Sequence, residues 1–303
     1  MQTLEPALRA AVARGDCVAA QRIVSDIQDL LAPTGHTARL MRAKNWFFEA
    51  KMEAGSLVIA EPGFIGVRRK VGPNTRVYLE ATALLAICLI RGNRIEEAED
   101  YISETVKRLR NIKSSAQQQA FRRSILTRFD EEAVVIALKG VGNDELDPAT
   151  VQEKAGTLVR QVDEHEIYRS LGQVVPLQKM KQLLEVRSHC QKLLTKDELK
   201  ALPSPETLAG DVEHGKTIFS AIRRRAWRAI CDPESEVYQV WTKGMEKALN
   251  THVLAGAVAS TLLGWKIGVY SIAVYVTALV LKVGLEGFCD VSKPHPLMGT
   301  RAG

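Results

Sequence analysis

The apolar positions of this chain recur every three or four residues along most of its length, which is the spacing of a helix with one buried face. The segments with this pattern are 4–31, 37–54, 76–91, 95–109, 132–139, 151–171, 177–194 and 217–230. No segment shows the sustained alternation of apolar and polar residues that is typical of a half-buried strand. The pattern predicts an all-α fold.

Turn and capping residues separate these helical segments. We expect turns at Pro33-Thr34-Gly35, Pro62-Gly63 and Pro203-Ser204-Pro205, among others. Asp147, Ser204 and Asp232 each precede a proline. Proline suits the first position of a helix, and Asp or Ser side chains cap its first N–H groups. Helices are therefore expected to begin at these three points.

The first third of the chain contains an internal repeat. The turn dipeptides Gly15-Asp16, Gly55-Ser56 and Asn93-Arg94 are separated by 40 and then 38 positions. Each is followed by an alanine five residues after its first member, at Ala20, Ala60 and Ala98. A small side chain just after the turn lets the second helix pack closely on the first, as stacked helical hairpins require.

This region resembles the tetratricopeptide-like repeat family over about residues 3–112. The resemblance is carried by small, apolar and turn residues near the positions of that motif, namely Ala86, Leu89, Asn93, Ala98 and Ile102. The chain departs from the motif in its longer period and in the aliphatic residues at most aromatic positions. The resemblance implies a superhelical surface that binds other proteins. The alternative is an ordinary helical bundle with an accidental repeat.

The sharpest contrast in hydropathy lies toward the C-terminal end. Residues 253–281 carry one formal charge, Lys266, so they need shelter in protein or in lipid. As one helix the stretch would be about 43 Å long and could cross a hydrocarbon core of about 30 Å, although a central lysine is costly there. Broken at Gly264 to Gly268, it forms two helices of about 12 and 14 to 18 residues, a length typical of a buried pair. The candidate markers of the turn, or of a docking or membrane surface, are Trp265, Lys266, Tyr270, Tyr275 and Lys282.

Composition narrows the picture. With 303 residues, of which 46% are hydrophobic and 25% charged, the chain can form one large or two ordinary domains. The five cysteines are scattered and form no CxxC pair, which favours buried, reduced thiols in a reducing compartment. The N-terminal residues lack the uninterrupted apolar core of a secretory signal. We therefore expect a cytoplasmic protein, with the inner face of a membrane as the alternative site.

Basic residues gather in two clusters within a chain of net charge +6. Such clusters could contact phosphates of lipid headgroups or of nucleic acid. Few aromatic residues accompany them, which disfavours nucleic acid, and a solvated helix face is the alternative. The candidates for anionic contacts are Lys107, Arg108, Arg110, Lys113, Arg122, Arg123 and Arg128, and then Arg223, Arg224, Arg225 and Arg228.

One motif suggests nucleotide chemistry. Residues 210–217 read GDVEHGKT, which satisfies the GxxxxGK[ST] phosphate-loop pattern through Gly210, Gly215, Lys216 and Thr217. The preceding Leu-Pro-Ser-Pro segment cannot form the central strand that such a loop follows, because proline lacks a backbone donor. Nucleotide binding is therefore disfavoured.

No other constellation favours catalysis. The six histidines are dispersed, and no HExxH motif, paired metal ligands or recognisable nucleophile setting occurs in the sequence. We therefore expect no metal and no cofactor.

The sequence predicts stacked helical hairpins over 1–112, a helical middle segment over 113–203 and a C-terminal helical module over 204–303 that contains the apolar pair. The expected function is non-catalytic protein–protein interaction or self-association, with the apolar pair as a docking element. The alternatives are a membrane-associated effector whose segment 253–281 enters a bilayer and, third, a nucleotide-binding protein.

Overall fold

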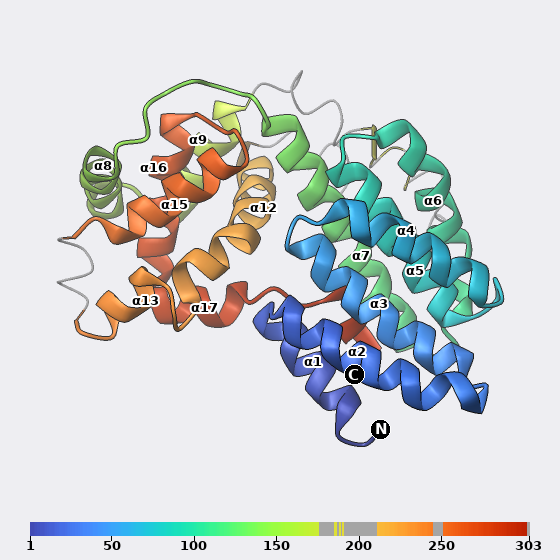
Figure 1. Ribbon diagram of the computed structural model, residues 1–303. Coiled ribbons are helices and arrows are strands. Elements are labelled where there is room, and N and C mark those ends of the chain that lie inside the picture. Colours follow the sequence, from blue (N-terminus) through green and yellow to red (C-terminus); the bar gives the residue numbers. More distant parts are fainter. Residues whose placement is uncertain (176–184, 187, 189, 191–210, 245–250, 302–303) are drawn as a thin grey trace. The chain divides into compact units, whose positions relative to one another are not determined.

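The computed structural model describes residues 1–175, 185–186, 188, 190, 211–244 and 251–301 (Figure 1). These residues form helices and connecting turns, with no strand among them, which confirms the all-α prediction. The chain divides into two compact units. Unit 1 comprises Met1–Phe129, Val186–Leu194 and His295–Gly303, and unit 2 comprises Asp130–Glu185 and Thr195–Pro294.

The two units interleave along the sequence, whereas we expected three consecutive segments. Helix α7 (Ser115–Leu138) gives its first part to unit 1 and its last part to unit 2, so no boundary falls at residue 112. The chain returns to unit 1 at its C-terminal end. Most of the helix expected over 177–194, and all of the turn at 203–205, lie outside the described residues.

Unit 1 is built from helical hairpins that follow one another along the chain. The helices pair as α1 (Leu4–Arg14) with α2 (Cys17–Leu31), α3 (Thr37–Glu53) with α4 (Leu57–Lys70), and α5 (Arg76–Arg91) with α6 (Ile95–Lys107). Each helix packs on the next one in the chain. The short 3-10 turns η1 (Ala32–Thr34) and η2 (Leu109–Asn111) follow the first and third hairpins. The expected hairpins are present, and membership of the tetratricopeptide-like family stays a prediction.

The three hairpins turn in the same way. Gly15, Gly55 and Asn93 have positive φ angles of 72°, 84° and 60°, a conformation that glycine and asparagine adopt at least cost. The next residue then donates its N–H to the carbonyl five positions back, at 2.8 or 2.9 Å, in Asp16 to Ala11, Ser56 to Lys51 and Arg94 to Leu89. The alanines that follow are fully buried, at Ala20, Ala60 and Ala98. The repeated sequence signal therefore corresponds to a repeated helix-ending turn.

The first helices of the hairpins share one face of unit 1. Helix α1 contacts α3, and α3 contacts α5. The C-terminal turn η5 (Leu297–Arg301) contacts α3 and α5 as well. The face formed by α1, α3 and α5 therefore holds a segment that is distant in the sequence, and we call residues 295–301 the C-terminal segment.

Pro62 and Gly63 lie inside α4, so the turn predicted there is wrong. Proline removes one backbone donor from the helix. Gly63, however, lies against the ring of Phe48 in α3, where an added Cβ would come within 2.5 Å of the ring. This close packing against α3 stabilises the helical conformation of α4 at and beyond Pro62.

The capping predictions have mixed outcomes. Asp147 caps α8 (Pro148–Gln161) as expected, since its side chain accepts a backbone N–H at 2.9 Å and Pro148 takes the first helical position. Asp232 does not begin a helix; it lies in a turn, and Ser235 caps the following helix by accepting the Tyr238 N–H at 3.2 Å. Ser204 lies outside the described residues.

Unit 2 surrounds a strongly apolar helix (Figure 1). Helix α16 (Tyr270–Val283) packs against its neighbours on several sides, and eight of its 14 residues are buried. The surrounding helices are α8, α9 (Glu164–Val174), α12 (Asp211–Cys231), α15 (Val253–Gly264) and α17 (Leu285–Ser292). A further short helix, α13 (Glu236–Trp241), packs on α12 and α15.

The stretch 253–281 forms the helix pair that we expected, with the break where we expected it. Helix α15 has 12 residues and α16 has 14. Between them Lys266 has a positive φ of 58°, and its carbonyl accepts the Gly140 N–H at 2.7 Å. The Gly268 N–H donates to the Val141 carbonyl at 2.9 Å. Backbone pairing with a second loop therefore fixes this turn.

Among the described residues, no single helix is both long and apolar enough to cross a bilayer. The pair α16 and α17, bent by 100°, meets the requirement by length and composition alone. A buried core helix meets the same requirement, and α16 is largely buried. The membrane alternative stays a prediction.

Two of the five cysteines form a disulfide, so the expectation of reduced thiols is wrong for them. Cys231 at the end of α12 is joined to Cys289 in α17, with the Cα atoms 5.5 Å apart. The two residues are 58 positions apart in the sequence, so no local spacing indicates the pair. Disulfides persist in oxidising compartments. The cysteines therefore no longer favour a reducing cytoplasm, and cytoplasmic localisation stays a prediction.

Gly215→Ala is expected to destabilise unit 2, because α12 and α9 approach too closely for a side chain. An added Cβ at Gly215 would lie 1.8 Å from the Tyr168 carbonyl oxygen. We expect a loss of about 1–3 kcal/mol in the free energy of unfolding, measured by urea denaturation. Gly264→Ala is the matched control, since an added Cβ there meets nothing within 4 Å. Equal stabilities of the two variants would contradict this packing.

Candidate functional site

The predicted anionic-contact residues fall in both units. Lys107, Arg110, Lys113 and Arg123 lie exposed in unit 1, and Arg228 lies exposed in unit 2. Arg122 and Arg223 are half-buried. An anionic surface made by these residues stays a prediction.

Three of the predicted contact residues pair with carboxylates of the protein, and for two of them this corrects the prediction. Arg128 is 4% exposed, and the Arg225 guanidinium lies 4.5 Å from the centre of the Trp265 ring. Each of the three is paired with a carboxylate, in Arg128 to Glu53, Arg224 to Glu131 and Arg225 to Glu132. A guanidinium removed from water needs such a partner. The side chains of Arg128 and Arg225 therefore stabilise the interior and are not placed to meet an external anion. For Arg224, whose side chain is 16% exposed and 3.7 Å from its carboxylate, the anionic contact stays a prediction.

Arg108 belongs to a network at the end of the third hairpin. It donates to Glu104 at 2.7 Å and to the Pro73 carbonyl at 2.9 Å. Arg68 donates to the same Glu104 carboxylate at 2.6 Å. Both guanidinium groups also lie within 5.1 Å of the centre of the Tyr78 ring. The network joins α4, α5 and α6, so Arg108 contributes to packing between helices.

Residues 211–217, which match most of the phosphate-loop pattern, form the first turns of α12. Lys216 pairs with Glu213 at 2.6 Å, and the Thr217 hydroxyl donates to the Glu213 carbonyl at 2.9 Å. A phosphate loop presents backbone N–H groups to its ligand, whereas those of Gly215, Lys216 and Thr217 come after the first four positions of α12 and are bonded within the helix. Gly210 lies outside the described residues. This geometry gives nucleotide binding no support.

The candidate markers of the apolar pair have separate positions in unit 2. Trp265 and Lys266 form the turn between α15 and α16, as expected. The Tyr270 hydroxyl donates to a backbone carbonyl of α8 at 3.1 Å. Tyr275 and Lys282 are half-buried on α16. Three of the five residues therefore lie on the core helix and two in the turn before it, and a docking surface made by them stays a prediction.

The face formed by α1, α3 and α5 holds the C-terminal segment through one carboxyl group. Glu49 of α3 is 2% exposed, and its two oxygens accept the backbone N–H groups of Leu297 and Met298 at 2.5 and 3.1 Å. These N–H groups begin the turn η5 and have no acceptor within it. The Leu297 and Met298 residues are 5% and 0% exposed. The hairpins of unit 1 therefore contact both the backbone and the side chains of this segment.

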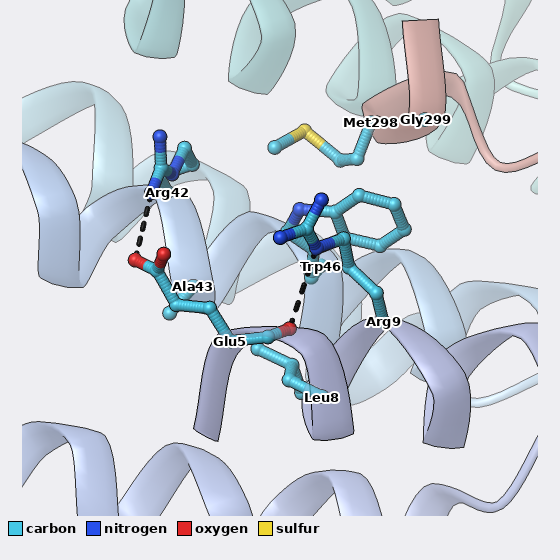
Figure 2. Close-up of a pocket in the computed structure, with 8 residues that line it drawn as sticks. All are labelled: Glu5, Leu8, Arg9, Arg42, Ala43, Trp46, Met298 and Gly299. Atoms are coloured by element: carbon cyan, nitrogen blue, oxygen red, sulfur yellow. Dashed lines mark hydrogen bonds and ion pairs between the residues drawn. The ribbon is translucent and has the colours of Figure 1, made fainter. Parts of the chain in front are cut away.

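A cavity of about 370 Å³ opens beside the C-terminal segment (Figure 2). Helices α1 and α3 supply most of its wall, and η5 closes one side. Its lining combines apolar and charged residues, Leu8, Ala43, Trp46, Met298 and Gly299 with Glu5, Arg9 and Arg42. Such a combination is typical of ligand sites.

Ion pairs fix the charged side of this cavity. Glu5 accepts hydrogen bonds from Arg39 and Arg42, each at 2.7 Å. The bond from Arg39 is the main cause that lowers the pKa of Glu5 to about 2. Glu5 therefore stays ionised at all ordinary pH values, joins α1 to α3 and holds two guanidinium groups at the rim.

The pKa of Glu49, the buried carboxyl group of α3, is raised, whereas that of Glu5 is lowered. Burial raises the pKa of Glu49 to about 8, and the charge of Glu53 adds to the rise. The N–H groups of Leu297 and Met298 lower the pKa in part. Glu49 therefore titrates near neutral pH while two backbone donors of the C-terminal segment depend on it.

Sequence reasoning missed Glu49 and the cavity. The residues that Glu49 binds are 248 and 249 positions away, and no local pattern encodes such a contact. One signal was present, because Asn45 and Glu49 lie one turn apart among the buried positions of α3. Polar groups at core positions need partners. Asn45 finds one in the Val77 carbonyl at 3.2 Å, and Glu49 finds one in the C-terminal segment.

Among the described residues, no group of three or more His, Cys, Asp or Glu side chains could hold a metal ion. In comparisons with known proteins, no family model, no curated protein and no solved structure matches this chain. The interpretation of the site therefore depends on its own geometry.

Raising the pH from 6 to 8.5 is expected to weaken unit 1 through Glu49. Its folded-state pKa of about 8 lies above the ordinary value of 4.5, so the folded state binds more protons between these values, and stability falls as the pH rises through them. Glu49→Gln cannot titrate at this position. Its free energy of unfolding relative to the wild type should therefore rise by about 2–3 kcal/mol between pH 6 and 8.5.

The measurement is urea unfolding of chain labelled with 5-fluorotryptophan, followed by the fluorine resonance of Trp46, the one tryptophan within residues 1–129. Glu96→Gln, at an exposed position of α6, serves as the control and should match the pH dependence of the wild type. A constant difference between Glu49→Gln and the wild type at all pH values would contradict the raised pKa.

Proposed function

We propose that this protein is a non-catalytic interaction protein whose unit 1 binds polypeptide on the face formed by α1, α3 and α5. The C-terminal segment is then an intrachain ligand of that face. The observation that carries the proposal is the pair of hydrogen bonds from the Leu297 and Met298 N–H groups to Glu49.

The contacts are of the kind that recognises a chain segment. Backbone donors meet a buried carboxyl group, which supplies affinity for any segment with two free consecutive N–H groups. The buried side chains of Leu297 and Met298 add apolar contacts that select among segments. Met298 suits such a surface because its flexible thioether adapts to irregular space.

Attachment to the same chain gives the C-terminal segment an advantage over any partner. A tethered ligand acts at a high effective concentration, set by the length of the connection. A partner segment must therefore bind more tightly than the C-terminal segment to replace it. The proposal accordingly includes self-association by exchange of this segment between two copies of the chain.

The apolar pair α15 and α16 is not part of this proposed binding face. Its buried residues lie in the interior of unit 2, and the docking role that we expected for it stays a prediction. The membrane-associated effector remains the second candidate, supported by the length and composition of the bent pair α16 and α17.

The proposal is tested by supplying the C-terminal segment as a separate peptide. A chain that ends at Pro294 should bind a synthetic peptide of residues 295–303 with a dissociation constant of about 10–100 μM, measured by calorimetry and by the fluorine resonance of Trp46. Circular dichroism first establishes that the shortened chain keeps its helices.

The matched control is the same peptide with ester bonds in place of the amides of Leu297 and Met298. Each ester oxygen replaces one N–H donor that meets Glu49 without adding bulk, and the exchange should weaken binding at least about tenfold. If the two peptides bind equally, or if a folded shortened chain binds neither, unit 1 does not recognise polypeptide in this way.

A further inference from the structure

The cavity beside the C-terminal segment carries an excess of positive charge. Arg9 and Arg42 line it, and Arg39 adjoins it through the shared carboxylate of Glu5. Glu5 is thus one negative charge among three positive ones. Its side chain is 18% exposed, whereas those of Arg39 and Arg42 are 43% and 33% exposed, so the guanidinium groups face solvent more than the carboxylate does.

The guanidinium groups retain donors for a further anion. An arginine has five N–H donors, and Arg42 gives one to Glu5 at 2.7 Å. Arg9 makes a long contact of 3.4 Å to the Glu5 backbone carbonyl, and it forms no ion pair with a carboxylate of the described residues. Arginine is well suited to bind a carboxylate through two parallel hydrogen bonds.

The rest of the cavity lining is largely apolar. Leu8 is 1% exposed, Trp46 is 9% exposed and Met298 is 0% exposed, so only parts of these residues reach the space. An added Cβ at Gly299 would lie 3.9 Å from an edge carbon of the Trp46 ring, which places the backbone of η5 beside the indole. A ligand here meets part of the Trp46 ring next to two cations (Figure 2).

The geometry points to a binding site for a carboxylate carried on a compact apolar group. The carboxylate meets Arg9 and Arg42, and the apolar group lies against Trp46. A volume of about 370 Å³ is at the small end of ligand sites, so the ligand is a small organic acid or a single acidic residue with an apolar neighbour. This site goes beyond the proposed function, because it is present while the C-terminal segment is bound.

The test uses the full chain labelled with 5-fluorotryptophan and the probe 3-phenylpropionate. The fluorine resonance of Trp46 should shift in a saturable way, and the neutral 3-phenylpropionamide should cause no saturable shift. The source of the acid is distinguished by a second pair of probes, acetyl-Leu-Glu-Leu-amide and its Gln analogue. Tighter binding of the acidic peptide than of 3-phenylpropionate indicates a protein partner, and the reverse order indicates a small acid.

Arginine variants locate the site. Arg9→Gln and Arg42→Gln should each weaken binding of 3-phenylpropionate at least fivefold. Arg9→Gln is the cleaner variant because it leaves the ion pairs of Glu5 intact. Arg22→Gln, at an exposed position of α2 outside the cavity, is the matched control and should bind as the wild type does.

Three results would overturn the inference: no saturable shift with either acid, equal binding of the acid and its amide, or equal losses in the Arg9→Gln and Arg22→Gln variants. Failure here is distinct from failure of the proposed function, which concerns the hydrogen bonds of the C-terminal segment to Glu49. The peptide experiment can succeed when no acid binds to the cavity, and the reverse also holds.

Discussion

One buried carboxyl group, that of Glu49, connects the helical hairpins of unit 1 with the C-terminal segment. A carboxyl group removed from water needs hydrogen-bond donors, and the N–H groups of its own helix are used within the helix. Leu297 and Met298 provide two donors, which themselves have no acceptor in η5. Separating the two would leave buried polar groups unsatisfied, at about 1–3 kcal/mol each. The segment and the face therefore stabilise one another.

Repetition explains how that face arises. In each of the three hairpins the first helix ends with a left-handed residue and the same backward hydrogen bond, so α1, α3 and α5 come to lie on one side. Unit 2 is built differently. Other helices of the unit surround the apolar helix α16, and backbone hydrogen bonds to a second loop fix the turn between α15 and α16. Buried polar groups thus lie on the face of unit 1 that holds the C-terminal segment, whereas the most apolar residues of unit 2 lie in its interior.

Local signals in the sequence predicted local structure well. The alanines after each turn and the break near Lys266 are encoded within a few residues, and both were correctly expected. Predictions that depended on distant partners were wrong or missing: Arg128 and Arg225 looked like surface cations, Cys231 and Cys289 looked like thiols, and Glu49 looked unremarkable. Burial and pairing across 58 to 248 positions decide these roles, and a single sequence does not display them. Pro62 was misread because its helix is stabilised by packing against α3.

The central claim is that Glu49 holds the C-terminal segment, and amide hydrogen exchange of the full chain tests it most directly. The account predicts that the Leu297 and Met298 amides exchange at least about a hundredfold more slowly than an unstructured peptide, and that Glu49→Ala removes most of this protection while the α5 amides keep theirs. Exchange of these two amides at the unstructured rate in the wild-type chain would contradict the account.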